Sequence, residues 1–286
     1  MNCPEIVETR HGRMMVRRND KYIGDMLARY GEYVPKETRV LSRLMPAGGV
    51  AVDVGANIGA TSLAIAEAGG ESGVVIAFEP QRQLYYMLCG NVALNGAKNV
   101  YCLHKAAGAK AGAVLVPELD LGREGNFGGL SLLDAEAYSK DHEMIPVDMM
   151  RIDDLRLSRC DLIKIDVEGM ELEVLEGASE TIKGHMPTIC VEDNRPALVP
   201  RLVAWLDQAG YLVFQHFPPL FSEDNFRGEQ ENIYGETVSA NLVCVHASRP
   251  VPDWLADEGM TTVVGKANIR EVYDGRTQEG HPDRHP

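Results

Sequence analysis

Val50 to Gly59 read VAVDVGANIG, an apolar run with one acid that leads into a turn with two glycines. The β-branched apolar residues predict a buried strand, and the apolar stretch from Thr61 to Ala68 predicts a helix after the turn. A strand, a glycine turn and a helix in this order bring a small ligand to the amino-terminal end of the helix. The predicted cofactor-binding residues of the turn are Gly55, Ala56, Asn57 and Gly59.

The glycine spacing bears on which cofactor binds. A dinucleotide site needs Gly-x-Gly-x-x-Gly, because the pyrophosphate lies against bare backbone. Here Asn57 replaces the central glycine, and Asp53 adds a negative charge just before the turn. Both features disfavour phosphate and favour a positively charged ligand such as S-adenosylmethionine, which has a sulfonium, an ammonium and no phosphate. An NAD-binding oxidoreductase is the alternative from another enzyme class.

Two further acids are predicted at strand ends. Val74 to Phe78 form a second buried strand that ends at Glu79-Pro80, and a carboxylate there can accept hydrogen bonds from both ribose hydroxyls. Glu79 and Pro80 are therefore predicted to bind the cofactor, with a solvated strand-end acid as the alternative. Asp161 to Val167 form another strand, which contains Asp166 and is followed by Glu168-Gly169. Because parallel strands end at one edge of a sheet, Asp53, Glu79 and Asp166 are expected to meet there.

Three motifs follow one another in a set order: DVGANIG at 53–59, FEP at 78–80 and IKIDVEGMELEVLEGA at 163–178. In this order and at these separations they resemble the FkbM-type S-adenosylmethionine-dependent methyltransferases. The resemblance implies an α/β, class I methyltransferase (Rossmann-like) fold, with a seven-stranded, mainly parallel sheet flanked by helices. It also implies that Glu168 lies beside the methyl donor and that the segment 129–131, with Ser131, approaches the adenine. A surface loop is the alternative for that segment.

The resemblance extends to both ends of the core. Residues 20–32 (DKYIGDMLARYGE) are similar to the family's lead-in, and we expect a helical lid with Tyr30, Tyr33 and Glu37 on its inner face. Residues 216–245 resemble a subgroup associated with carbohydrate and secondary-metabolite modification. The resemblance thus implies O-methylation of a sugar hydroxyl. The alternatives are N- or carboxyl-methylation of a small metabolite or peptide, and a non-catalytic partner of glycosyltransferases that only binds S-adenosylmethionine.

The predicted domain organisation has three parts. Residues 1–49 are the lead-in and lid, 50–248 the methyltransferase core, and 249–286 a polar tail. Further strands are predicted at 99–107, 188–192, 211–216 and 242–246, and the resemblance implies that the last two form a hairpin-like edge. Residues 108–160 interrupt the alternation of strands and helices, which predicts a β insertion in the core with a short helix around 132–138. The long segment 217–239 contains aromatic residues, which favours contact with the substrate.

Composition limits the partners. The chain has 286 residues, with 28 Lys and Arg against 42 Asp and Glu, and a formal net charge of −14 disfavours nucleic acid. A local basic patch (Arg10, Arg13, Arg17, Arg18) either contacts an acidic substrate or is simply solvated. The sequence has no transmembrane run, no signal peptide and no CxxC pair, which predicts a cytoplasmic protein with free thiols. The expected partner is a small-molecule or glycan acceptor. The oligomeric state stays open, with a homo-oligomer as one outcome.

Methyl transfer to a hydroxyl needs either a base or a metal ion to deal with the acceptor's proton. The predicted catalytic residues are Asp166, Glu168 and His216, and Glu192 is a further candidate base. The metal route uses Asp166, Asp193 and Asn194 as oxygen ligands for Mg²⁺ or a similar cation. This set is similar to that of catechol O-methyltransferase, although Gly169 stands where that enzyme has its catalytic lysine. In the alternative interpretation, Asp193 and Asn194 cap the next helix.

Overall fold

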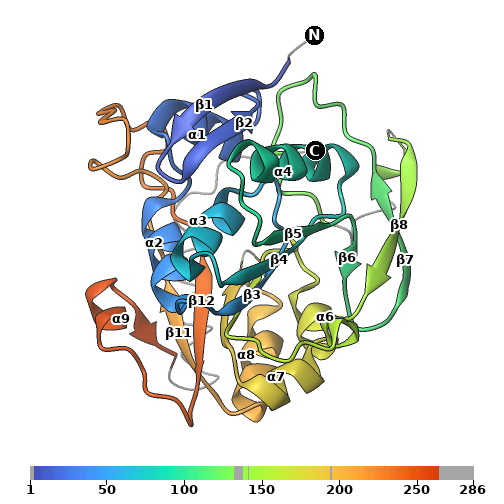
Figure 1. Cartoon of the computed structure of the whole chain (residues 1–286), viewed down its shortest axis with the longest axis vertical. Coiled ribbons are helices and arrows are strands. Elements are labelled where there is room, and N and C mark those ends of the chain that lie inside the picture. Colours follow the sequence, from blue (N-terminus) through green and yellow to red (C-terminus); the bar gives the residue numbers. More distant parts are fainter. Residues whose placement is uncertain (1–2, 132–137, 141, 194, 264–286) are drawn as a thin grey trace.

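A single large sheet forms the centre of the computed structural model, which describes residues 3–131, 138–140, 142–193 and 195–263. Within these residues the sheet has eight strands in the order β13-β11-β12-β10-β9-β3-β4-β5 (Figure 1). Five of them are parallel: β3 (Val50–Val54), β4 (Val74–Phe78), β5 (Val100–Leu103), β9 (Leu162–Ile165) and β10 (Thr188–Glu192). The remaining three are β11 (Tyr211–His216), β12 (Asn241–His246) and β13 (Thr261–Thr262).

The sheet confirms the predicted α/β class with mainly parallel strands. β12 runs antiparallel to both of its neighbours, β10 and β11, so the expected hairpin-like edge is present. The predicted count of seven strands differs from the eight described, because the two-residue strand β13 pairs with β11 at the edge. Two residues are too few to leave a periodic signal in the sequence.

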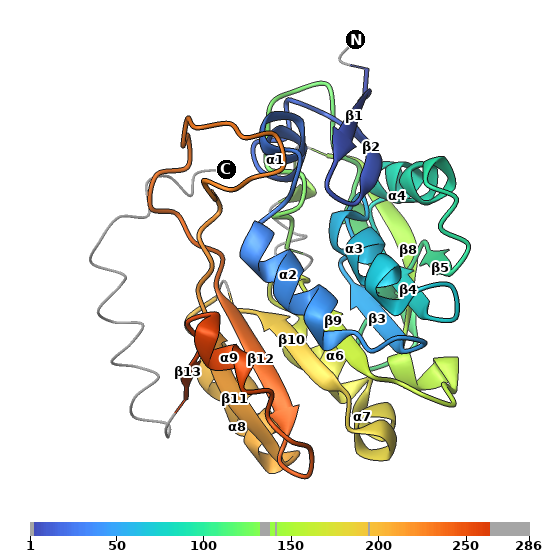
Figure 2. The ribbon, with the colours of Figure 1, turned by 60° about the vertical axis from the view of Figure 1, so that its left-hand side comes forward.

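Helices cover both faces of the sheet (Figure 2). Apolar residues of α2, α3, α4 and α9 pack with Ala51, Val75 and Val243 on one face. Residues of α6, α7 and α8 pack with Val52, Ile163 and Val213 on the other. The bounds are α1 (Ile23–Tyr30), α2 (Pro35–Leu44), α3 (Ala60–Gly69), α4 (Arg82–Leu94), α6 (Glu171–Glu176), α7 (Ser179–His185), α8 (Val199–Gln208) and α9 (Trp254–Asp257).

A second, three-stranded sheet forms the predicted insertion. It has the order β6-β8-β7, with β6 (Ala106–Ala107) parallel and β7 (Gly112–Pro117) antiparallel to β8 (Met144–Met150). A short 3₁₀ helix, η2 (Ile152–Leu155), follows. The predicted single strand 99–107 is therefore split, since β5 stays in the main sheet and β6 joins the insertion. Most of the helix predicted around 132–138 lies outside the described residues.

The amino-terminal segment forms an antiparallel hairpin, β1 (Glu5–Thr9) with β2 (Gly12–Val16), which was not predicted. Two of the four arginines of the basic patch, Arg10 and Arg13, lie in this hairpin, and the other two follow β2 directly. Arg10 pairs with Glu32, and Arg18 pairs with Glu5. These two cations are thus neutralised within the protein, which weakens the case for an acidic substrate at the patch.

The segment 217–239 packs against α1, as both ribbon views show (Figures 1 and 2). Tyr30 anchors it: the Tyr30 hydroxyl donates a hydrogen bond to the carbonyl of Glu231 at 2.9 Å, and its ring centroid lies 5.4 Å from that of Phe221. Tyr30 therefore holds this segment and does not line an inner face toward the strand ends. Whether α1 and α2 act as a lid stays a prediction.

Among the described residues, no helix is both long enough and apolar enough to span a membrane. All six cysteines are free, as predicted. Most of the predicted polar tail, from residue 264 onward, lies outside the described residues.

Candidate active site

The predicted acids come together at the carboxyl edge of the parallel strands. Glu79 follows β4, Asp166 follows β9, and Asp53 lies in β3 between those two strands. Lys164 joins two of the acids, because its Nζ lies 3.4 Å from Asp53 Oδ1 and 3.2 Å from Asp166 Oδ2. The acids thus share one edge, and a lysine that the sequence analysis missed lies among them.

Lys164 is the buried cation of this edge. Its side chain comes from β9, is only 5% exposed, and donates a hydrogen bond to the carbonyl of Gly55 at 3.2 Å. Burial alone would lower the pKa of Lys164, but Asp166, Asp53 and further acids raise it above its ordinary value. Lys164 therefore stays charged and neutralises part of a strongly acidic site.

Asp53 is held entirely by protein groups. Its carboxylate is fully buried, and Oδ2 accepts hydrogen bonds from Thr61 Oγ1 at 3.1 Å and Ser62 Oγ at 2.5 Å. Together with Lys164, these contacts tie β3 to the first turn of α3. Asp53 therefore stabilises the cofactor turn through these contacts in the protein interior.

The glycine turn is shaped by close contacts within the protein. Gly55 has φ +80°, and a Cβ at this position would lie 1.8 Å from the carbonyl oxygen of Asp166. Gly59 has φ +90°, and its Cβ would lie 2.7 Å from Leu88 Cδ1. Asn57 also has a positive φ, +51°, a conformation that asparagine tolerates better than most residues. Gly55 is therefore required by the close backbone contact, whereas at Gly59 the positive φ is the main reason for glycine.

Glu79 orients the same turn. Its Oε2 accepts a hydrogen bond from the backbone N–H of Asn57 at 2.8 Å, and Oε1 accepts one from Gln81 at 2.7 Å. Burial raises the pKa of Glu79 to about 7, although these two hydrogen bonds act to lower it. Each carboxylate oxygen keeps a second lone pair, so the predicted bonds from ribose hydroxyls are compatible with this geometry.

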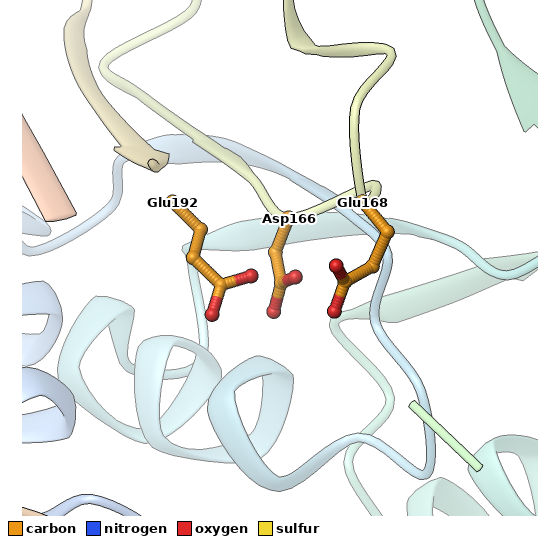
Figure 3. A group of neighbouring side chains, drawn as sticks. All are labelled: Asp166, Glu168 and Glu192. Atoms are coloured by element: carbon orange, nitrogen blue, oxygen red, sulfur yellow. The ribbon is translucent and has the colours of Figure 1, made fainter. Parts of the chain in front are cut away.

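Three acids form a compact group next to Lys164: Asp166, Glu168 and Glu192 (Figure 3). One carboxylate oxygen of each lies within 4.8 Å of the others. Burial and the nearby Asp166 raise the pKa of Glu192 well above its usual range. Burial also acts to raise the pKa of Asp166, but Lys164 and a hydrogen bond with Glu192 lower it overall. Within this pair Glu192 therefore holds a proton more readily, and Asp166 carries the charge more readily.

The backbone explains how Glu168 joins the group. Glu168 has φ +55° and Gly169 has φ +117°, so two successive left-handed residues turn the chain sharply after β9. A non-glycine residue in this conformation is strained, and such strain is typical of functional sites. This turn brings the Glu168 side chain to the Asp166 carboxylate.

His216 lines a small internal cavity with Glu37, Lys164, Glu192 and Asn241. The cavity leaves the centre of a water molecule about 10 Å³, which is room for one water. Burial, helped by Lys36, lowers the pKa of His216 to about 4, so the imidazole is neutral at physiological pH. Its Nε2 makes no hydrogen bond to any residue that the structure describes. His216 thus faces the interior side of the acidic edge.

Comparison with known proteins identifies the family. Residues 53–213, more than half of the chain, match the model of the Methyltransferase FkbM domain. The chain belongs to the FkbM methyltransferase family. A relative of this FkbM protein is Methyltransferase sdnD of Sordaria araneosa, which is 31% identical over 195 residues, covering 58% of this chain and 75% of sdnD.

Two solved structures show weaker similarity. The FkbM methyltransferase of Methylobacillus flagellatus is 18% identical with a TM-score of 0.47, over 69% of this chain and 44% of that one. TYW2 of M. jannaschii, solved with AdoMet, is 14% identical with a TM-score of 0.44, over 86% of both chains. The chain thus spans less than half of the M. flagellatus protein. Family membership confirms the prediction from the three motifs: the chain is a methyltransferase, S-adenosylmethionine-dependent by fold.

In this FkbM methyltransferase, the two residues just before the segment 129–131, which is predicted to approach the adenine, contact Gln81 and the glycine turn. Gln81 Nε2 donates to the carbonyl of Phe127 at 2.9 Å, and a Cβ at Gly128 would lie 2.8 Å from Asn57 Nδ2. Ser131, at the end of this segment, is 2% exposed. Pro80 lies on the other side of Glu79, and its carbonyl contacts His104 Nε2 at 3.1 Å. The cofactor roles of these residues stay predictions.

Of the predicted metal ligands, Asp166 belongs to the group of acids that the structure shows. Asp193 is 3% exposed and is not part of the group of Asp166, Glu168 and Glu192, and Asn194 lies outside the described residues. Sequence reasoning placed Glu192 only among the candidate bases. Lys164 had one available signal, since it is the only charged residue in the strand LIKI, all of which is buried.

Proposed function

We propose that this FkbM methyltransferase methylates a hydroxyl group of a sugar, in a glycan, a glycolipid or a glycosylated metabolite. The observation that carries the proposal is the group of Asp166, Glu168 and Glu192 at the carboxyl edge of the sheet. An alkyl hydroxyl is a weak nucleophile near neutral pH and needs a proton acceptor. An ionised Asp166 next to Glu168 supplies one.

The charge of the site bears on the other acceptor classes. A carboxylate acceptor would approach three acids, while the nearest cation, Lys164, is already paired with Asp53 and Asp166. Carboxyl methylation is therefore disfavoured by charge repulsion. The net charge of −14 argues in the same way against a nucleic-acid acceptor. An amine acceptor fits the charge, and N-methylation is the competing outcome of the test below.

The residues present suit S-adenosylmethionine. When bound, it supplies an electrophilic methyl group on a sulfonium. Glu79 would hold the ribose, the turn from Gly55 to Gly59 would line the nucleoside, and the acids around Asp166 would favour its positive charges. Lys164 lowers the pKa of Asp166 and so favours its ionised form, which can accept the proton that the acceptor hydroxyl loses. Glu192, whose pKa is raised, holds a proton more readily than Asp166.

A divalent cation fits the acidic group less well. A metal ligand must be deprotonated, whereas the pKa of Glu192 is raised, so a cation would have to displace a proton there. Lys164 also supplies positive charge 3.2 Å from Asp166. We therefore expect methyl transfer to persist when a chelator is added. Activity that is lost with the chelator and restored by Mg²⁺ would overturn this part.

The proposal is tested with S-adenosylmethionine that carries a labelled methyl group. The protein is incubated with separate saccharide, peptide and amine fractions of a cell extract, and label is counted in each. We expect label in saccharides, and its loss in Asp166→Asn. Label in peptides or amines would replace the proposal with N-methylation. Donor binding without label in any fraction would support the non-catalytic partner, and NAD binding without donor binding would support the oxidoreductase.

A further inference from the structure

A surface groove of about 1000 Å³ lies between the start of α1 and the segment 217–239. This volume is at the upper end of what small-molecule sites use. The residues that line this groove belong neither to the three motifs nor to the group of acids at the carboxyl edge. The lining residues used below are Lys21, Tyr22, Asp25, Glu124, Ile233 and Tyr234.

Two tyrosines form an aromatic wall of this groove. The rings of Tyr22 and Tyr234 stack with centroids 6.2 Å apart and an interplanar angle of 21°. The hydroxyl of Tyr234 is fixed, because it donates to the carbonyl of Lys21 at 3.0 Å and lies 3.3 Å from Asp25 Oδ2. Tyr22 is 37% exposed, so part of it stays open to a ligand. A rigid aromatic surface with polar neighbours suits a ligand that has both C–H and O–H groups.

The charges around the groove are paired. Lys21 Nζ lies 3.6 Å from Glu124, and Asp25 lies 3.7 Å from Arg29. These groups offer hydrogen-bond donors and acceptors without an excess of positive charge. A phosphorylated ligand or a nucleic acid would need such an excess. A neutral, hydroxyl-rich ligand does not.

The groove adjoins the candidate active site. The backbone N–H of Lys21 donates to the carbonyl of Gly125 at 2.9 Å. Three residues further on, a Cβ at Gly128 would touch both Asn57 in the cofactor turn and Ile23 in α1. One short segment therefore contacts both the groove wall and the glycine turn. The groove and the cofactor turn are thus linked through residues 125–128.

We propose that this groove binds the saccharide part of the acceptor, with a neutral sugar ring against Tyr22 and Tyr234. This inference rests on the proposed sugar methylation and adds to it the surface that selects the acceptor. Tyr22 would contribute affinity for the acceptor and no chemistry. Its loss should therefore raise the acceptor concentration needed for half-maximal rate and leave the maximal rate unchanged.

The test uses Tyr22→Ala, with Tyr22→Phe retaining the ring and Tyr101→Ala as a matched control. Tyr101 is 57% exposed on β5, outside the groove lining. Label transfer is measured against increasing amounts of the saccharide fraction. We expect the half-saturating amount to rise about tenfold in Tyr22→Ala, as for the loss of one aromatic contact. The Tyr22→Phe and Tyr101→Ala variants should match the wild type.

Two readouts separate the possible failures. Calorimetric titration with S-adenosylmethionine should give wild-type affinity for all three variants, which shows that the fold and cofactor site are intact. If wild type labels saccharides and Tyr22→Ala saturates normally, the groove assignment is wrong and the proposed function stands. Ile233→Ser, at a residue of the groove lining that is 43% exposed, is a second variant that should also raise the half-saturating amount. If wild type labels peptides instead of saccharides, both proposals fail.

Discussion

Replacing Lys164 by methionine tests the central claim about the acidic edge. Methionine keeps most of the side-chain volume and removes the charge, so Asp53 is left fully buried without its cation. Breaking a buried ion pair by removing one partner costs about 3 to 5 kcal/mol in the free energy of unfolding. For a chain of this size we expect the melting temperature to fall by roughly 6 to 20 °C at pH 7.

The loss of stability in Lys164→Met should depend on pH in a defined direction. Without the lysine, the pKa of Asp166 rises in the folded state. A carboxyl with a raised folded pKa contributes stability below its unfolded pKa of about 3.9 and loses it as the pH rises. In wild type, the lowered pKa of Asp166 gives the opposite dependence. The difference between the two proteins should therefore be small near pH 4 and large at pH 7.

Denaturant unfolding of wild type and Lys164→Met at pH 4.5 and pH 7 measures this difference. Adding Asp53→Asn to Lys164→Met removes the orphaned charge and should recover part of the loss. Lys105→Met is the matched control, because Lys105 pairs with Asp148 at 2.8 Å on the surface, where an ion pair contributes little. The reasoning would be refuted by a Lys164→Met protein as stable as the control, or by a loss that is the same at both pH values.

Three further predictions concern single side chains. Gly55→Ala should cost more than about 3 kcal/mol in the free energy of unfolding, because its Cβ would lie 1.8 Å from the Asp166 carbonyl oxygen. Gly96→Ala, also at positive φ but with no atom within 4 Å, should cost only about 1 to 2 kcal/mol by denaturant unfolding. The pKa of Glu79 is raised to about 7, so the free energy of unfolding of wild type should fall by up to about 3 kcal/mol between pH 4.5 and 7. Glu79→Gln should lack this pH dependence. Equal pH dependence in the two proteins would contradict the prediction. Tyr30→Phe removes the hydrogen bond to the Glu231 carbonyl and should lower the free energy of unfolding by about 1 to 2 kcal/mol. The variant should also be cleaved faster by a protease within 217–239. Unchanged cleavage would show that other contacts hold the segment.

The sequence predicted the core strands well because their signals are local. β4, β10 and β11 have the predicted bounds, since each is a short apolar run between turn-forming or polar residues. The hairpin β1-β2 was missed for the same physical reason. Only alternate residues such as Val7, Met14 and Val16 are buried there, and the arginines between them made the segment look like a solvated basic patch. A two-residue strand such as β13 has no pattern to find.

At the site, the sequence predicted which acids lie at the shared strand-end edge, but it did not predict which side chains pair with one another there. Acids at the ends of parallel strands must share an edge, so Asp166 and Glu79 were predictable. Lys164 was not, because a fully buried strand has no alternating pattern that tells which side chain faces which neighbour. His216 was predicted at the pocket mouth from its place at a strand end. Its side chain is instead 2% exposed and lines a small pocket with residues of the reversed strand β12 and of helix α2.

These pairings give a physical reason why the three motifs occur together. Asp53 and Gly55 in DVGANIG meet Lys164 and Asp166 in IKIDVEG through an ion pair, a hydrogen bond to a carbonyl, and a backbone approach that only glycine allows. Glu79 in FEP holds the first motif from the other side, at the Asn57 N–H. Each motif thus fixes the backbone of another, and their energies cannot be additive. The double variant of Gly55→Ala and Lys164→Met should cost less than the sum of the two single variants, because either change alone already separates the same two loops.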